Sequence, residues 1–155
     1  MAIIFITGMS GVGKTTTLEH LALEGYHVVE TDVGYTGVIE TDQGTEIGWD
    51  EEKIQHLIDH YQDKDLFISG CYANQGKFYQ YFDQVVLFTA DLNTMFKRID
   101  QRTNNNYGKT EAEKAEILDN VEFVLPLLRE SSDLIIDTTN KSIEQICDQL
   151  KSLLN

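Results

Sequence analysis

Residues 8–15 read Gly-Met-Ser-Gly-Val-Gly-Lys-Thr, which is the phosphate-binding pattern G-x-x-x-x-G-K-[ST]. Glycines in such a loop let several backbone N–H groups face one anion, and the dipole of a following helix adds to the attraction. In this pattern the Lys14 ammonium would reach the β- and γ-phosphates of a nucleotide, and the Thr15 hydroxyl would be a ligand of Mg²⁺. We expect the nucleotide to contact Gly8, Met9, Ser10, Gly11, Val12, Gly13, Lys14, Thr15 and Thr16.

The residues on either side of this loop favour phosphate binding over a chance glycine-rich turn. The apolar run at 2–6, Ala-Ile-Ile-Phe-Ile, is typical of a buried parallel strand, and residues 16–23 have the composition of a helix. A glycine loop between a strand and a helix is the context in which this motif binds phosphate.

Four more apolar runs of the strand type follow, and helical patterns separate them. Such alternation predicts a parallel sheet with helices on both faces. We therefore expect an α/β protein with three α/β/α layers, formed by residues 1–155 as a single domain. The five strand-like runs lie at 2–6, 27–31, 65–69, 84–89 and 133–138.

Capping residues predict where the helices begin. An acidic first turn indicates a helix over 50–62, and Pro126 should bend or end a long helix that starts near residue 110. The last helix carries an apolar stripe that includes Cys147, so we expect this cysteine to be buried. The predicted caps are Asp91 for a helix over 92–102, the capping box of Thr110 and Glu113, and the capping box of Ser142 and Gln145.

Two segments do not fit the plain alternation of strands and helices. Residues 33–49 contain four glycines around Asp42-Gln43-Gly44, which predicts a β-hairpin inserted after the second strand. Residues 103–110, Thr-Asn-Asn-Asn-Tyr-Gly-Lys-Thr, are polar and rich in turn formers. We expect this second segment to be a mobile lid over a substrate.

Four features of the sequence occur together. They are the loop G-M-S-G-V-G-K-T-T at 8–16, Thr31-Asp32, R-I-x-x-R at 98–102, and I-D-T-T-x-x-S-I-E at 136–144. With these features the chain resembles, over essentially its whole length, the small-molecule P-loop kinases of the nucleoside monophosphate kinase and shikimate kinase group. A segment at 69–79 looks like that of a bacterial, AAA-type kinase-like subgroup. The resemblance implies a sheet of order 2-3-1-4-5, with ATP and Mg²⁺ on the glycine loop. It also implies a small-molecule acceptor bound between the region 33–80 and the lid.

The resemblance also implies roles for polar residues near the nucleotide. Asp32 would orient the acceptor hydroxyl, accept its proton or contact Mg²⁺, although a turn residue at a strand end is the plainer interpretation. Asp91 could do the same work, but its place before Leu92 favours an N-cap. Of Arg98 and Arg102, one would stack on adenine and the other would contact phosphates, unless both are surface charges. Thr138 and Thr139 would lie beside the adenine, and Lys109 could replace a missing lid arginine.

The acceptor would bind near the residues that follow the third strand. Gly70, Cys71, Asn74, Gln75 and Lys77 are candidates, because polar residues at the C-terminal end of a parallel strand suit ligand recognition. Residues 30–65 contain eleven acids but only two lysines and no arginine, so an uncharged or cationic hydroxyl compound fits better than a phosphate or carboxylate. Aromatic residues that either wall the pocket or belong to the core are Tyr35, Trp49, Tyr72, Phe78 and Tyr79.

Composition excludes several classes of partner. The chain has 155 residues and a net charge of −14, which argues against nucleic acid and anionic membranes. Its two cysteines do not suggest a disulfide framework, and its four histidines show no metal-ligand spacing. We expect no signal peptide and no membrane span, and we expect a cytoplasmic monomer or homodimer. Three interpretations stay open at this point. The protein is an ATP-dependent phosphotransferase for a small molecule, a regulatory ATPase or switch that acts on a protein partner, or a protein with an intact nucleotide pocket but no catalysis.

Overall fold

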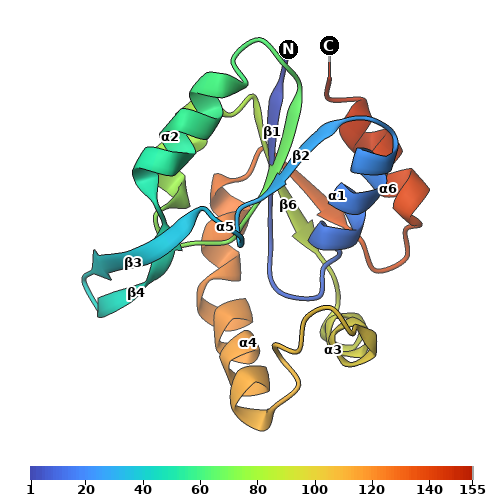
Figure 1. Cartoon of the computed structure of the whole chain (residues 1–155). Helices are drawn as coiled ribbons and strands as arrows, with labels where there is room; N and C mark the ends of the chain where they lie inside the picture. Colours follow the sequence, from blue (N-terminus) through green and yellow to red (C-terminus); the bar gives the residue numbers. More distant parts are fainter. Residues whose placement is uncertain (155) are drawn as a thin grey trace.

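A five-stranded parallel sheet forms the centre of the molecule in a computed structural model that describes residues 1–154 (Figure 1). The strand order is β2-β5-β1-β6-β7, which is 2-3-1-4-5 when only the strands of this sheet are counted, as the resemblance implies. All five residues of β1 are buried, as expected for the central strand of a covered sheet. The strands are β1 (Ile3–Thr7), β2 (His27–Glu30), β5 (Leu66–Ser69), β6 (Gln84–Thr89) and β7 (Leu134–Asp137).

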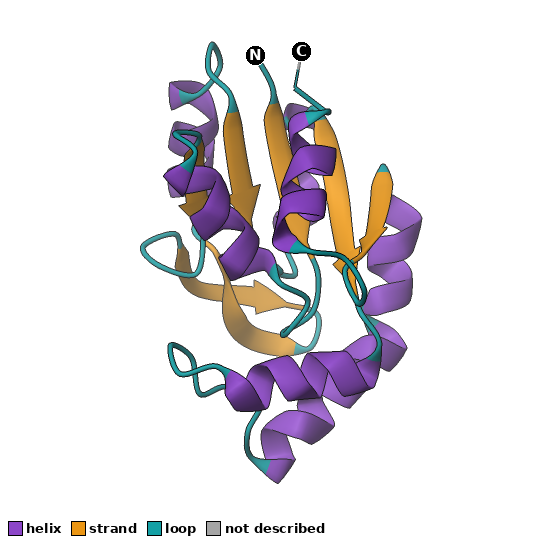
Figure 2. Cartoon of the chain, turned by 90° about the vertical axis from the view of Figure 1, so that its right-hand side faces the viewer, coloured by secondary structure: helices purple, strands orange, loops and turns teal. Residues whose placement is uncertain are grey.

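Helices cover both faces of this sheet, which confirms the predicted α/β class (Figure 2). Alternate residues of β1 point to opposite faces, so Ile4 and Ile6 pack with α1 and α6, while Ile3 and Phe5 pack with α2 and the 3₁₀ helix η1. The helices are α1 (Lys14–Leu23), α2 (Glu51–His60), η1 (Gln75–Tyr81), α3 (Leu92–Gln101), α4 (Glu111–Phe123), α5 (Leu125–Ser131) and α6 (Ile143–Lys151).

The predicted capping residues all cap helices. The Asp91 carboxylate accepts a hydrogen bond from the Thr94 amide at 2.7 Å, which supports the N-cap interpretation of this residue. Both predicted capping boxes are present, and Cys147 is fully buried in α6. Pro126 stands in the first turn of α5, where its missing N–H costs nothing, and α4 ends just before it at Phe123.

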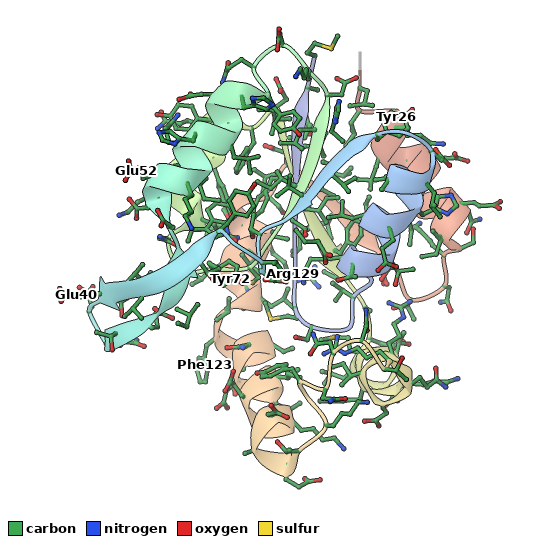
Figure 3. All side chains as sticks on the ribbon, viewed as in Figure 1. Tyr26, Glu40, Glu52, Tyr72, Phe123 and Arg129 are labelled. Carbon is green, nitrogen blue, oxygen red and sulfur yellow. The ribbon has the colours of Figure 1, made fainter. Side chains whose placement is uncertain are left out.

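The predicted hairpin is formed by β3 (Thr36–Thr41) and β4 (Gly44–Trp49), which pair in antiparallel register. It projects away from the main sheet, and Glu40 lies near its tip (Figures 1 and 3). Its base is held by Asn74, whose side-chain oxygen accepts from the Trp49 amide at 2.9 Å and whose NH₂ group donates to the Trp49 carbonyl at 2.9 Å.

In the described residues no helix is long and apolar enough to cross a bilayer.

Candidate functional site

A cavity of about 440 Å³ opens where the loop after β1 enters α1, beyond the C-terminal ends of the strands. In parallel α/β sheets this is the edge at which ligands bind. The cavity brings together side chains from the glycine loop, the end of β2, α3, the predicted lid and α6. Its lining residues are Ser10, Gly11, Val12, Gly13, Lys14, Thr15, Thr16, Asp32, Arg98, Gln101, Arg102, Asn104, Asn105, Thr138, Lys141, Ile143 and Ile146.

Two glycines of the loop have no room for a side chain. A Cβ on Gly8 would lie 2.5 Å from the Phe88 carbonyl oxygen, and one on Gly11 would lie 2.7 Å from the Met95 carbonyl oxygen. Gly11 also has a φ of +82°, which L-residues rarely adopt. The loop therefore runs in close contact with β6 and α3, and its residues 10–16 line the cavity.

Lys14 lies folded back over the loop that precedes it. Its ammonium donates hydrogen bonds to the carbonyls of Gly8 and of Met9, the latter at 3.0 Å. Burial lowers the pKa of Lys14, while the nearby Cys71 side chain and Asp32 carboxylate act in the opposite direction. The lysine is thus held at the base of the cavity, where a phosphate would meet it.

The Thr15 hydroxyl donates a hydrogen bond of 2.5 Å to the Glu30 carboxylate. Glu30 is the last residue of β2 and stands two positions before Asp32, so sequence analysis could have noted it from the run Val28-Val29-Glu30-Thr31-Asp32, although we assigned it no role. A hydroxyl and two carboxylates are the hard oxygen donors that Mg²⁺ prefers. These groups fit a magnesium ion that also binds nucleotide phosphates. Within residues 1–154 no cluster of three or more acidic, histidine or cysteine side chains could hold a metal ion by itself.

Asp32 lies on the cavity wall and is exposed. Its carboxylate accepts a hydrogen bond from the Tyr72 hydroxyl, which comes from the segment after β5. Figure 3 shows Tyr72 close to the stretch of chain that connects β2 to β3. Burial and the hydrogen bond to Asp32 raise the pKa of Tyr72, so its phenol stays protonated.

Thr31, the residue before Asp32, is held by hydrogen bonds to two neighbouring segments. The Thr31 hydroxyl donates to the Ser69 carbonyl at 2.7 Å and accepts from the indole N–H of Trp49 at 2.8 Å. A Cβ on Gly70 would lie only 2.4 Å from the Thr31 hydroxyl oxygen. The ends of β2, β4 and β5 are therefore fastened together directly beside Asp32.

Arg98 connects the glycine loop to the segment after β7. Its guanidinium donates to the Gly11 carbonyl at 3.3 Å, to the Thr138 hydroxyl at 3.0 Å and to the Thr138 carbonyl at 2.8 Å. The Thr138 hydroxyl in turn donates to the Val12 carbonyl at 2.7 Å. Thr139 does not line the cavity, and its hydroxyl accepts from the amide of Asp91 at 3.0 Å.

Arg102 organises the predicted lid, which connects α3 to α4. Its guanidinium donates to the carbonyls of Asn105 at 3.0 Å and of Tyr107 at 2.7 Å, and the ammonium of Lys109 donates to the Arg102 carbonyl at 2.7 Å. Burial lowers the pKa of Arg102. Lid residues thus reach the same cavity as the glycine loop, because Asn104 and Asn105 line it.

The residues predicted to bind the acceptor after β5 lie outside this cavity. Asn74 and Gln75 are buried, and their amide groups bind protein atoms: Asn74 holds Trp49, and Gln75 contacts the Tyr72 amide. Lys77 forms an exposed ion pair with Glu51 at 3.0 Å. A role for them in acceptor binding stays a prediction, as it does for the half-buried Cys71 and for Gly70.

Burial decides which of the five candidate aromatic residues belong to the hydrophobic core and which could form a wall of the pocket. Trp49 and Phe78 are buried in the core cluster on the α2 face, and Tyr35, Tyr72 and Tyr79 are partly buried against it. The Trp49 ring makes an edge contact with Phe5 at a centroid distance of 5.3 Å. Trp49 and Phe78 therefore belong to the core.

A family model described as "AAA domain" matches residues 4–119, which include the glycine loop, the hairpin and the predicted lid. The chain belongs to the AAA domain family. It is a P-loop protein of the kinase-like type, as the motifs of the loop and of the second strand indicate.

Solved kinases share the fold of this AAA-domain chain. Shikimate kinase from Acinetobacter baumannii, solved in complex with shikimate, is 22% identical with a TM-score of 0.68, covering 99% of this chain and 93% of that one. Shikimate kinase from Bacteroides thetaiotaomicron is 18% identical with a TM-score of 0.64, covering 99% and 98%. A sugar kinase from Janibacter is 15% identical with a TM-score of 0.61, covering 99% and 94%.

One curated relative is named a nucleotide-binding protein and comes from Renibacterium salmoninarum. It is 23% identical over 158 residues, which include 99% of this chain. The chain spans 50% of that relative's length.

Proposed function

We propose that this protein transfers the γ-phosphate of ATP to a hydroxyl group of a small molecule. The observation that carries the proposal is that the Asp32 carboxylate lines the same cavity as Lys14 and Thr15. An exposed carboxylate opposite a phosphate-binding lysine is the arrangement that a kinase needs, because it can orient an acceptor hydroxyl toward the γ-phosphate.

In the proposed reaction, the acceptor oxygen forms a bond to the γ-phosphorus while the bond to the bridging oxygen of ADP breaks. Asp32 orients the hydroxyl and takes up its proton. Lys14 and Arg102 stabilise the negative charge that spreads over the phosphate oxygens. Thr15 and Asp32 would hold Mg²⁺, which supplies positive charge to the phosphates when bound with ATP, and Glu30 would orient the Thr15 hydroxyl.

We propose an uncharged or cationic acceptor, such as a nucleoside, a sugar or an amino sugar. The three arginines of the chain are Arg98, Arg102 and Arg129, and none belongs to the region 33–80. The lysines near the hairpin base are already engaged: Lys53 donates to the Gly34 carbonyl at 3.2 Å, and Lys77 pairs with Glu51. An anionic acceptor would lack the guanidinium clamp that usually binds phosphate or carboxylate groups.

The test is Mg²⁺-dependent ADP release from ATP, measured with separate pools of nucleosides, sugars, aminoglycosides, shikimate and nucleoside monophosphates. We expect one of the neutral or cationic pools to raise the rate by about tenfold or more over the rate without acceptor. Lys14→Met is the control, and it should abolish the increase. Strong turnover with a monophosphate and none with neutral acceptors would contradict the proposed acceptor class.

A second function is a nucleotide-dependent switch or regulatory ATPase that acts on a protein partner. It is favoured by the curated relative, which is named only for nucleotide binding and is about twice as long as this chain. ATP hydrolysis that no acceptor pool changes, together with a partner that binds only the ATP-loaded protein, would support the switch over the kinase.

A further inference from the structure

The hydroxyl of Tyr72 and the carboxylate of Asp32 meet although the residues are forty positions apart in the chain. The phenol donates to one oxygen, Oδ1, and no side chain among residues 1–154 makes another hydrogen bond to this carboxylate. Asp32 is exposed, so protein atoms do not otherwise exclude water from it. The phenol thus occupies one of the two carboxylate oxygens when the acceptor is absent.

The main chain of Tyr72 is fixed while its side chain is half-buried. The Tyr72 amide donates to the Gln75 side-chain oxygen at 2.9 Å. The NH₂ group of Gln75 donates to the Thr7 hydroxyl at 3.1 Å and to the Tyr79 hydroxyl at 2.9 Å, and Gln75 is only 3% exposed. Because this buried amide fixes the backbone, the phenol can leave Asp32 by rotation of its own side chain.

The position of the phenol matters for any acceptor that approaches from the end of β5. Tyr72 lies in the segment that follows that strand, and its hydroxyl binds Oδ1 of Asp32. A hydroxyl that arrives from there finds this oxygen already bound. It must replace the phenol before Asp32 can orient it.

We propose that Tyr72 is a positioning residue that withholds Oδ1 of Asp32 from water and releases this oxygen to the acceptor. This inference rests on the proposed function. A water molecule that replaces the phenol exchanges one hydrogen bond to Asp32 for another, and it gains no additional binding energy. An acceptor also brings contacts elsewhere, and this binding energy can drive the exchange. Tyr72 therefore limits the side reaction in which water attacks the γ-phosphorus, its proton passes to Asp32, and ADP and phosphate leave.

The experiment compares Mg²⁺-dependent ATP hydrolysis without any acceptor in the wild type and in Tyr72→Phe. We expect the hydrolysis rate to rise about tenfold in Tyr72→Phe. This is less than the roughly 10²–10⁴-fold rate increase that a fully positioned general base contributes. The affinity for Mg-ATP should not change. In Tyr72→Phe combined with Asp32→Asn the increase should disappear. Hydrolysis at or below the wild-type rate in Tyr72→Phe, or an increase that persists in the double variant, would overturn the inference.

Tyr81→Phe is the matched control. Tyr81 is 42% exposed on η1 and its hydroxyl makes no hydrogen bond within the described residues, so hydrolysis should stay at the wild-type rate.

A readout that does not depend on activity is the ¹⁹F NMR signal of 3-fluorotyrosine placed at position 72. This signal should shift in the Asp32→Asn background. An unchanged signal would show that the two side chains do not interact and would overturn the inference.

Failure of this inference and failure of the proposed function give different results. If no acceptor pool raises ADP release, the kinase proposal fails, but the hydrolysis comparison still decides the role of Tyr72, because water is the acceptor in that assay. If a pool does raise ADP release and Tyr72→Phe hydrolyses ATP at the wild-type rate, the kinase proposal stands and only the role of Tyr72 is rejected.

Discussion

At the scale of single residues, Glu30 is the group that sequence analysis overlooked. It accepts the hydrogen bond of Thr15, the residue whose hydroxyl the glycine-loop pattern assigns to Mg²⁺. A carboxylate that binds a metal ligand orients that ligand and contributes negative charge next to the ion. The strength of Mg-ATP binding should therefore depend on Glu30.

We expect Glu30→Gln to weaken binding of Mg-ATP by about tenfold, because loss of a carboxylate next to a metal ligand typically costs 10–100-fold. Binding of ATP in the presence of EDTA should change little. Isothermal titration calorimetry with and without Mg²⁺ measures both. Glu19→Gln is the control, since Glu19 is exposed on α1 and forms no ion pair in the described residues. An equal loss with and without Mg²⁺ would argue against a role near the metal.

At the scale of secondary-structure elements, the junction of β2, β4 and β5 is the tightest part of the site. The Thr31 hydroxyl makes two hydrogen bonds there, one to the Ser69 carbonyl and one from the indole of Trp49. Both Thr31 and Trp49 are completely buried. A buried N–H group that loses its acceptor costs more than the hydrogen bond itself contributes.

Thr31→Val keeps the shape of the side chain and removes its hydroxyl. We expect it to lower the free energy of unfolding by about 1–3 kcal/mol, because the Trp49 N–H is left without a partner. Urea denaturation followed by circular dichroism measures the change. Thr45→Val, at an exposed position of β4, should be neutral. A neutral Thr31→Val would mean that the indole finds another acceptor.

At the scale of the whole molecule, the excess of negative charge is the dominant property. Lysine and arginine number 12 against 26 acidic residues, and the net charge is −14. The ion pairs of the structure are exposed to half-exposed and contribute little to stability. Repulsion between the acids should therefore outweigh these pairs.

Raising the salt concentration from about 0.01 M to about 0.15 M shortens the Debye length from roughly 30 Å to roughly 8 Å. We expect the melting temperature to rise by a few degrees over this range, as measured by differential scanning calorimetry. NaCl and KCl should act alike at equal ionic strength. A fall in melting temperature would show that attractive ion pairs dominate instead.

The periodicity of the sequence was sufficient to predict the strands, the helices between them and the caps, because each depends on residues that are neighbours in the chain. The strand order was predicted only from the resemblance to P-loop kinases. The hairpin was likewise predicted from its local turn at Asp42-Gln43-Gly44. The contacts of Glu30 with Thr15 and of Tyr72 with Asp32 depend on which strands lie side by side. The buried hydrogen bonds of Asn74 and Gln75 also depend on tertiary structure, since a polar run after a strand has the same composition whether it faces a ligand or the core.

Trp49 is the single tryptophan of the chain, and it is bound to the residue next to Asp32. Its fluorescence therefore comes from one place, a dry site at the base of the hairpin. Any ligand that shifts β2 or the hairpin should change the wavelength or the intensity of this tryptophan emission. The protein thus contains its own optical probe beside the proposed catalytic carboxylate, and candidate acceptors can be screened by light emission without a label or a coupled reaction.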